Sequence, residues 1–335
     1  MDIAVHHFLT TLPTIAVLAV VAFTLFTLSK GADILVDEAV SLSVHWGVPK
    51  LIIGATIVSL GTTLPEATVS VLAAVNGNPD LALGNAVGSI IADTGLIIGI
   101  AAMIGVLPVD RNTIDRQGRI QFAAGILLTA VSLPLFSKTP GGVIHQWMGG
   151  IFLLLLAAYI YISIRWSRAL SASTGEIFHE ENRPVYVQLA KLGLGITLVI
   201  LSSKVLIPAV EITAIRAGIP QSVIAATLVA FGTSLPELIT AVTAVRKGHG
   251  ELAIGNIIGA DVLNVLFVVG SAAAVTTEGL RVPPDFYKLQ FPAMLIILTA
   301  FRIFAKNKKG AIAKREGIFL AGIYAIYIIL NYTWI

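Results

Sequence analysis

Long apolar segments alternate with short polar stretches along the whole chain. Ten of these segments have about 18 or more residues, the length at which a helix crosses a bilayer. They cover residues 12–29, 50–75, 81–107, 120–137, 145–165, 185–209, 218–245, 251–275, 288–305 and 316–334. The pattern predicts an all-α integral membrane protein with ten transmembrane helices. No basic leader or small-residue cleavage site precedes the first segment, so we expect a retained helix rather than a signal peptide.

The composition supports a membrane protein and orients it. Only 12% of the 335 residues are charged and 56% are hydrophobic, whereas soluble domains carry about 25% charged residues. The depletion excludes a soluble fold, and we expect the lipid bilayer rather than nucleic acid as the partner of the basic residues. With the N-terminus outside, most of the 22 Lys and Arg lie inside, and the outer side keeps only Lys138, Lys204, Arg216, Arg281 and Lys288. The positive-inside rule therefore predicts that both termini are outside.

The chain contains an internal repeat. Residues 54–99 align without a gap with residues 225–270, and 17 of the 46 aligned positions are identical. Each repeat holds five apolar segments, and an odd number makes the second copy enter the membrane from the opposite side. We therefore expect a first five-helix repeat over residues 1–166, a cytoplasmic linker over 167–184 and an inverted second repeat over 185–335.

The first repeated motif is GTTLPE at Gly61–Glu66, mirrored by GTSLPE at Gly232–Glu237. Each copy lies in the middle of an apolar segment, where proline removes a backbone donor and breaks the helix. The break is expected to free backbone carbonyls, including those of Ser59 and Ala230. Free carbonyls cost several kcal/mol each in hydrocarbon, and a hard cation is a suitable partner for them.

A glutamate ends each copy of this motif, and both should lie at bilayer depth. Burying one charged carboxylate costs roughly 2.5–3.5 kcal/mol on insertion scales. If Glu66 and Glu237 converge, their like charges require a cation or a proton between them. Two kinked helices with locally capped glutamates are the alternative, but the recurrence of Glu at the same place in both repeats favours an ion site.

The second repeated motif is GNAVGS at residues 84–89, mirrored by GNIIGA at residues 255–260. Glycines four residues apart are by themselves typical of close helix packing. However, Asp93 follows the first copy and Asn264 follows the second, and Ser89 lies one helical turn before Asp93. Carboxylate, amide and hydroxyl oxygens are ligands that hard cations prefer, so the combination indicates a cation site.

With both motifs present in two copies, the sequence resembles the Ca²⁺/cation antiporter superfamily, and most closely its prokaryotic Na⁺/Ca²⁺ exchanger branch. The resemblance covers nearly the whole chain. It implies a secondary antiporter, not an enzyme, that exchanges Ca²⁺ for Na⁺ by alternating access in the cytoplasmic membrane. It also implies that broken helices 2, 3, 7 and 8 form the core, that helices 1 and 6 are long and tilted, and that the monomer is functional. The transported Ca²⁺ and Na⁺ would be the bound ions, with no covalent cofactor.

The resemblance also implies a role for each residue of the motifs. Ca²⁺ would be held by Glu66, Glu237, Thr62 and Thr233. The flanking Na⁺ sites would use Thr63, Ser234 and Ser89 with the carbonyls of Ser59 and Ala230, and the middle site would use Asp93 and Asn264.

The sequence departs from the family pattern at several positions. Ala260 replaces a serine, so one Na⁺ site loses a hydroxyl, and Asp93 and Asn264 reverse the usual order of Asn and Asp. Asp261 stands where many relatives have Asn, and it is either a substitute ligand or a polar contact to helix 7. Lys204 either extends outward to the interface or neutralises a core carboxylate. The counter-ion therefore stays open, with a Ca²⁺/H⁺ or a K⁺-dependent antiporter as the alternative.

Overall fold

The computed structural model describes residues 2–109, 111–134, 141–174, 184–218, 233–306 and 310–333, and most of them are helical. The first half contains α1 (Asp2–Thr11), α2 (Thr14–Trp46), α3 (Lys50–Ile53), η1 (Gly54–Val58), α4 (Ser59–Thr62), α5 (Leu64–Val75), α6 (Pro79–Ala92), η2 (Asp93–Ile97), α7 (Ile98–Ile104), β1 (Leu107–Pro108), α8 (Arg111–Val131), β2 (Gly142–Ile144) and α9 (Gln146–Thr174). The second half contains α10 (Val185–Arg216), α12 (Leu235–Arg246), α13 (Gly250–Leu263), η3 (Asn264–Val269), α14 (Gly270–Ala274), β3 (Leu280–Val282), η4 (Phe286–Gln290), α15 (Phe291–Ala305), β4 (Ala311–Ile312) and α16 (Lys314–Thr333). The η segments are π-helical.

Among the described residues, six helices are long and apolar enough to cross a membrane, and a seventh is added if one bent pair counts as a single span. The bent pair joins Lys50–Thr62 to Leu64–Val75 at an angle of 45°. The break was predicted at this place, where Pro65 cannot donate a backbone hydrogen bond. The first part of the predicted segment 218–245 lies outside the described residues.

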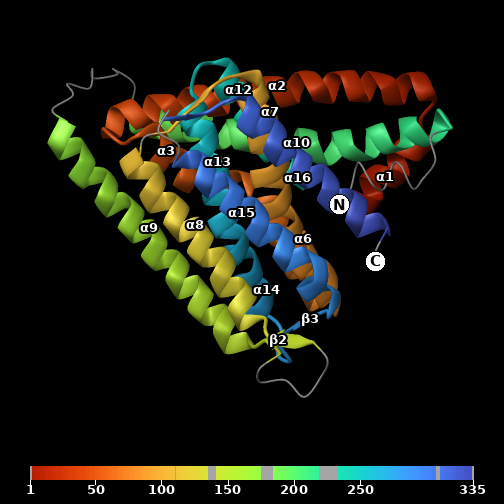
Figure 1. The fold of residues 1–335 in the computed structure, drawn as a ribbon. Coiled ribbons are helices and arrows are strands. Elements are labelled where there is room, and N and C mark those ends of the chain that lie inside the picture. The colour runs from red at the N-terminus through yellow and green to blue at the C-terminus, as the bar shows by residue number, and fades with distance from the viewer. Residues whose placement is uncertain are drawn as a thin grey trace.

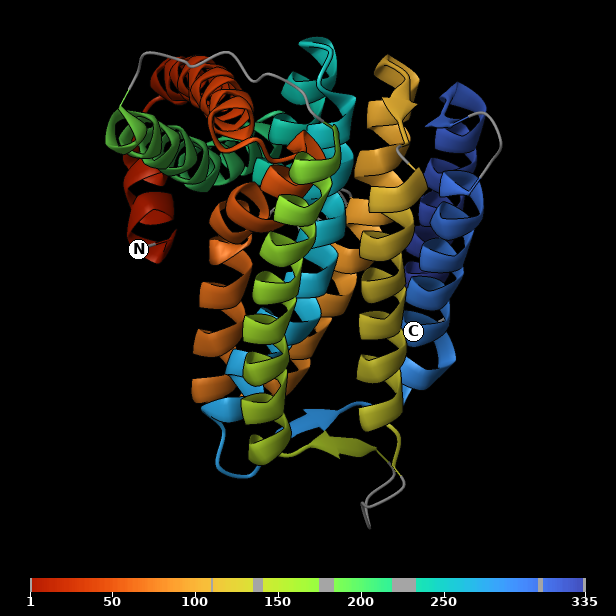
Figure 2. The same ribbon diagram turned by 90° about the vertical axis from the view of Figure 1, so that its left-hand side faces the viewer.

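Two long helices, α2 and α10, lie side by side and cross the end of the helical bundle (Figure 1). In the second view they are seen nearly end-on, while α8 and α9 run along the length of the bundle (Figure 2). Their close approach needs glycine, because a Cβ on Gly31 would lie 2.8 Å from Leu198 Cβ and one on Gly195 would lie 2.7 Å from the Leu35 nitrogen. The pair thus packs as one tilted unit.

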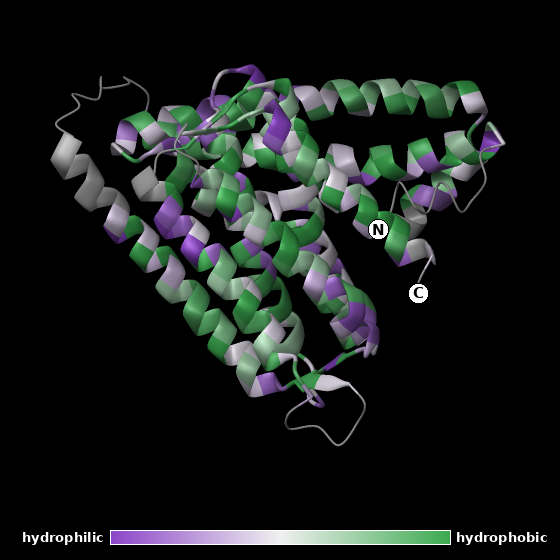
Figure 3. Ribbon diagram, in the orientation of Figure 1, coloured by the Kyte–Doolittle hydropathy of each residue, from purple (hydrophilic) through white to green (hydrophobic). Residues whose placement is uncertain are grey.

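The helices that carry the repeated motifs are the most enclosed. In the most apolar window of Gly250–Ala274, 94% of the residues are buried, compared with 22% in Gln146–Trp166 of α9. Hydrophobic residues predominate along the described parts of α9 and α2 (Figure 3), and many of their large apolar side chains are exposed, as expected for helices that face lipid. The α13–η3–α14 unit is therefore the centre of the molecule, and α9 lies at its periphery.

Two small antiparallel sheets close the ends of the bundle. Strand β1 pairs with β4, and β2 pairs with β3 at the end shown at the bottom of Figure 1. Helix α8 runs between them, since it begins just after β1 and ends before β2. The sequence pattern did not predict these strands, which have only two or three residues each.

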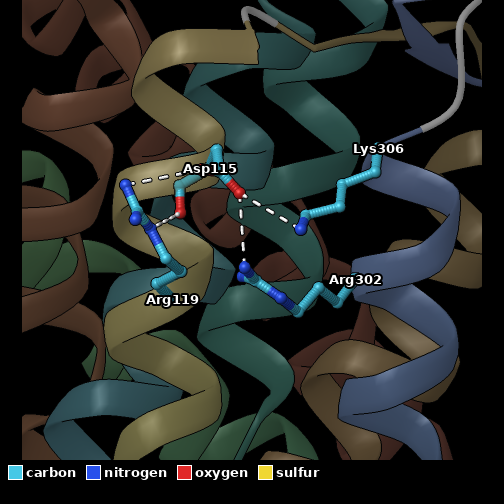
Figure 4. A network of polar contacts seen from close by, with 4 residues as sticks. All are labelled: Asp115, Arg119, Arg302 and Lys306. Atoms are coloured by element: carbon cyan, nitrogen blue, oxygen red, sulfur yellow. Dashed lines mark hydrogen bonds and ion pairs between the residues drawn. The ribbon is translucent and has the colours of Figure 1, made fainter.

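A charged network joins α8 to α15 near the β1–β4 end (Figure 4). Asp115 on α8 forms ion pairs with Arg302 at 3.2 Å, with Lys306 at 3.6 Å and with Arg119 at 3.4 Å. Three cations surround one carboxylate, so this network carries an excess of positive charge.

Candidate functional site

The two glutamates of the repeated motif each lie in the first turn of a helix. Glu66 is in the first turn of α5 and Glu237 is in the first turn of α12, each directly after a proline. Proline is tolerated there because the first N–H groups of a helix need no intrahelical acceptor. The same free N–H groups favour a negative charge. The Leu-Pro-Glu sequence therefore starts a helix in both repeats and places a carboxylate at its beginning.

Both glutamates are buried in the middle of the molecule, each with 1% of its surface exposed. Glu237 interacts electrostatically with Glu66 and with Asp93, and Glu66 interacts with Asp93. The predicted convergence of these acids is therefore seen in the structure.

The threonines of each repeat contact asparagines of the other repeat. Thr62 Oγ1 donates to Asn256 Oδ1 over 3.3 Å, and Thr233 Oγ1 donates to Asn85 Oδ1 over 3.1 Å. The two contacts are equivalent in the repeat alignment: the first runs from a threonine of the first repeat to an asparagine of the second, and the other runs from the second repeat to the first. Thr63 Oγ1 adds a third contact between the repeats, because it donates to Glu237 Oε1 over 3.4 Å.

The negative charge of the site is not balanced by buried cations. No Lys or Arg is buried among the described residues. Within the same part of the chain, both carboxylate oxygens of Glu66, Oε2 of Glu237 and Oδ1 of Asp93 have no hydrogen-bond partner. A buried carboxylate without a partner carries a large desolvation penalty. The described chain contains no group of three His, Cys, Asp or Glu residues that could hold a metal ion. A cation here would therefore also need hydroxyl, amide or carbonyl oxygens.

The remaining predicted ligands, where the structure describes them, belong to the helices that carry the repeated motifs. Asp93 is the first residue of the π-helical η2, and Asn264 is the first residue of the π-helical η3. Single π-turns inside helices are frequent at functional sites. Ser89 Oγ lies 3.5 Å from Thr233 Oγ1, and Ser234 is buried. Ala230 lies outside the described residues.

The prediction that the Ser59 carbonyl is free was wrong. It accepts the backbone N–H of Thr63 over 2.9 Å and the Thr62 hydroxyl over 3.4 Å. The reason is the hydrogen-bond register, because the missing donor of Pro65 would have served the carbonyl of Gly61, four residues earlier. These two donors occupy both lone pairs of the Ser59 carbonyl, so it accepts a cation only where the Thr62 hydroxyl turns away.

The hydrogen bonds of Asp261 go to residues outside the predicted ligand set. Its Oδ2 accepts the Thr94 hydroxyl over 2.5 Å and the Gln121 amide over 2.6 Å. Thr94 lies in η2 and Gln121 in α8, so these hydrogen bonds do not go to the described part of helix 7, and Asp261 Oδ1 has no hydrogen-bond partner among the described residues. The face of α13 that carries Asp261 is set by tertiary packing, which the repeat pattern does not reveal.

Two asparagines were overlooked as site residues. Besides accepting from Thr233, Asn85 donates to the Glu66 carbonyl over 3.2 Å and to Ser70 Oγ over 3.0 Å. Asn256 accepts from Thr62 and is fully buried. Their repetition in both Gly-Asn-x-x-Gly motifs was the available signal, since glycine packing alone does not require an asparagine.

A cavity of about 250 Å³ reaches the site from the β2–β3 end of the bundle. Asp80 at the start of α6 and Asn331 near the end of α16 line its outer part. Ser89, Thr233 and Ser234 line its inner part. Polar side chains thus extend from the end of the bundle to the candidate ligands.

Comparison with known proteins identifies the family. A family model described as "Sodium/calcium exchanger protein" matches residues 16–165 and 187–333, which together make up most of the chain. The chain belongs to the sodium/calcium exchanger family. It is therefore a membrane protein of the antiporter type, and a carrier rather than an enzyme.

Relatives match the exchanger chain over nearly its full length. Inner membrane protein YrbG of Escherichia coli K12 is 32% identical over 313 residues, with 90% of this chain and 92% of YrbG covered. Sodium/calcium exchanger MaX1 of Methanosarcina acetivorans is 26% identical over 338 residues and covers 90% and 95%. A solved structure of the sodium-calcium exchanger NCX_Mj superimposes with a TM-score of 0.80 at 26% identity, covering 95% of this chain and 99% of the other. Sequence and fold thus agree on the prokaryotic exchanger branch.

Proposed function

We propose that the protein exchanges Ca²⁺ for Na⁺ across the cytoplasmic membrane of a prokaryote. The observation that carries the proposal is the pair of buried carboxylates, Glu66 and Glu237, without a buried cation among the described residues. A membrane protein keeps such a pair at a cost, and bound cations offset that cost. The names of MaX1 and NCX_Mj support Na⁺ and Ca²⁺ as those cations.

The proposed architecture is ten transmembrane helices in two inverted repeats, residues 1–166 and 185–335, with a cytoplasmic linker over 167–184. The paired Thr–Asn contacts, each running from one repeat to the other, support this symmetry. The network around Asp115 supports a cytoplasmic location for the β1–β4 end (Figure 4), because positive charge gathers on the inner side. Both termini would then be outside, and the monomer would contain the complete site.

The proposed ligands are the oxygens around the two glutamates. Glu66 and Glu237 would bind Ca²⁺ with the hydroxyls of Thr62 and Thr233. Na⁺ would bind beside them, at the oxygens of Thr63, Ser234, Ser89, Ser59 and Ala230, and Asp93 and Asn264 would hold the middle position. Hydroxyl, amide and carboxylate oxygens suit both hard cations.

Charge balance explains why the exchange would be obligatory. Glu66, Glu237 and Asp93 provide up to three negative charges, which three Na⁺ neutralise, as do Ca²⁺ and one proton. The empty, charged site is costly to move through apolar surroundings, so the two loaded states interconvert and the empty one does not. Ala260 supplies no hydroxyl, which removes one oxygen from the Na⁺ side and makes the stoichiometry a quantity to measure.

Proteoliposomes test the proposal directly. Vesicles loaded with Na⁺ should take up ⁴⁵Ca²⁺ when they are diluted into Na⁺-free medium, and Glu66→Gln or Glu237→Gln should abolish the uptake. Glu211→Gln, on the partly exposed surface of α10, is the matched control and should transport normally. Uptake that follows a pH gradient and ignores Na⁺ would establish a Ca²⁺/H⁺ antiporter, and a requirement for K⁺ would establish the K⁺-dependent type. Retained transport in Glu66→Gln would contradict the site.

A further inference from the structure

Asp261 is a fourth buried acid in the core, with 2% of its surface exposed. One of its oxygens accepts both the Thr94 hydroxyl and the Gln121 amide, and Gln121 Nε2 also lies 3.2 Å from Thr94 Oγ1. The three side chains form a closed polar cluster that joins α13, η2 and α8. Such a cluster fixes the relative positions of the three segments, because each hydrogen bond restricts two of them.

The other repeat has no matching cluster at the symmetry-related positions, as far as the alignment reaches. The positions equivalent to Asp261 and Thr94 in the repeat alignment are Ile90 and Val265, and both are buried apolar residues. Gln121 lies beyond the aligned segments 54–99 and 225–270. Inverted symmetry therefore does not require the cluster, and helix packing at the equivalent place succeeds without it. The buried acid at position 261 is therefore better explained by a role of its own than by the packing that both repeats share.

The cluster is connected to both residues of the middle position. Thr94 directly follows Asp93, and the two are the first residues of the π-helical η2. A π-turn is wide and rare, so an external hydrogen bond at its second residue restrains the direction of its first. Asp261 lies three residues before Asn264, on the same side of the helix. Asp261 also interacts electrostatically with Asp93.

We propose that Asp261 is a positioning residue that holds Asp93 in place for cation binding, through its hydrogen bond to Thr94. The inference rests on the proposed function, since it assumes that Asp93 takes part in the cation site. It concerns two positions at which this chain departs from the family pattern, since acids occupy both position 261 and position 93.

The test compares variants that separate the charge of Asp261 from its hydrogen bonds. In Asp261→Asn the amide oxygen still accepts from Thr94 and Gln121, so the position of Asp93 is retained. Asp261→Val removes both contacts, and Thr94→Val removes only one. We expect the Ca²⁺ concentration for half-maximal Na⁺-driven uptake to rise at least tenfold in Asp261→Val and Thr94→Val. It should change less than threefold in Asp261→Asn, and the maximal rate should change less than that concentration in all three.

A double-mutant cycle and a binding measurement complete the design. The Asp261→Val/Thr94→Val variant should be no worse than Asp261→Val alone, because both changes break the same contact. Thr129→Val is the matched control, since the Thr129 hydroxyl donates to the Gly125 carbonyl of its own helix. If Asp261→Val does not fold, Thr94→Val carries the test alone, because it leaves the Asp261–Gln121 bond intact.

Two outcomes would overturn the proposal, and each differs from failure of the proposed function. Equal impairment of Asp261→Asn and Asp261→Val would assign the effect to charge rather than to position. Unchanged Ca²⁺ affinity in Thr94→Val, measured by titration calorimetry in detergent, would exclude coupling through that hydroxyl. A wild-type protein that neither binds nor transports Ca²⁺ would instead contradict the proposed function itself.

Discussion

Lys247, directly after α12, forms an ion pair of 2.9 Å with Asp37 on the tilted helix α2. It also lies 3.1 Å from Asp33, one turn earlier on the same helix. These contacts tie the tilted α2–α10 unit to the core. The symmetry-related pair cannot form the same ion pair, because Asn76 aligns with Lys247 and Lys204 aligns with Asp33.

Replacement of Lys247 should loosen α2 from the core. Lys247→Met leaves Asp33 and Asp37 as an unpaired like-charge couple one turn apart, which is unfavourable. Partly exposed ion pairs contribute about 0.2–1 kcal/mol each, so the fold should survive. The chain has no cysteine, so a single Ala39→Cys on the buried face of α2 reports the separation. Its labelling by a thiol reagent should become several-fold faster in Lys247→Met.

Lys288→Met is the control for this experiment. Lys288 forms an ion pair of the same length with Asp285, but the pair is local, between residues three apart. Labelling of Ala39→Cys should not change in this variant. Equal labelling rates in wild type and Lys247→Met would show that the Lys247 contacts do not hold α2.

Thr62→Val and Thr233→Val should impair Ca²⁺ uptake to a similar extent, because each threonine makes the equivalent contact to an asparagine of the other repeat. Each substitution leaves an amide oxygen, of the buried Asn256 or of the partly buried Asn85, without its hydroxyl donor. An unsatisfied buried polar group costs about 1–3 kcal/mol. Half-maximal Ca²⁺ uptake should therefore need roughly tenfold more Ca²⁺ in each variant. Thr197→Val on the exposed face of α10 is the control, since that hydroxyl donates to the Gly193 carbonyl of its own helix. A large loss in one variant and none in the other would contradict an equivalent role.

Gly259→Ala should separate α13 from the broken helix that carries the first motif. A Cβ on Gly259 would lie 2.4 Å from Ser59 Oγ and 2.5 Å from the Ala55 carbonyl oxygen. The backbone cannot yield cheaply here, and overpacking of this kind typically costs about 1–3 kcal/mol. The thermal unfolding midpoint should fall, and Ca²⁺ affinity should fall with it because Ser59 is displaced.

Gly150→Ala, on the peripheral helix α9, is the matched control. No described atom lies within 4 Å of a Cβ at that position. Alanine in an exposed helix is favoured over glycine by about 0.5–1 kcal/mol, so the midpoint should stay or rise slightly. A fall as large as that of Gly259→Ala would mean that helix glycines act through something other than this contact.

The repeated acids could be found from the sequence because two copies of one pattern report the same constraint. Glu66 and Glu237 each follow a proline inside an apolar segment, and burial and helix breaking both follow from local chemistry. The extent of α2 could not be found in this way. Its apolar run ends at residue 29, yet the helix continues to Trp46, with Leu35, Val36 and Ala39 on its buried face and with Asp33 and Asp37 paired with Lys247, more than 200 residues away. The contacts of Asp261 could not be found from the sequence either, because its partners Thr94 and Gln121 belong to the other repeat.

Acid should destabilise the end of the protein near His249. Burial and the neighbouring Lys50 ammonium, whose Nζ lies 3.2 Å from His249 Nδ1, lower the pKa of His249 below its usual value of about 6.5. The unfolded chain therefore binds a proton that the folded protein resists, so the contribution of this group to stability is present above about pH 6.5 and is lost as the pH falls through the lowered pKa. Thermal midpoints measured from pH 8 to pH 5 should fall less steeply in His249→Gln than in wild type. Lys50→Met should also flatten the profile, because it removes the repelling charge, and a profile as steep as that of wild type in both variants would assign the acid sensitivity to other groups.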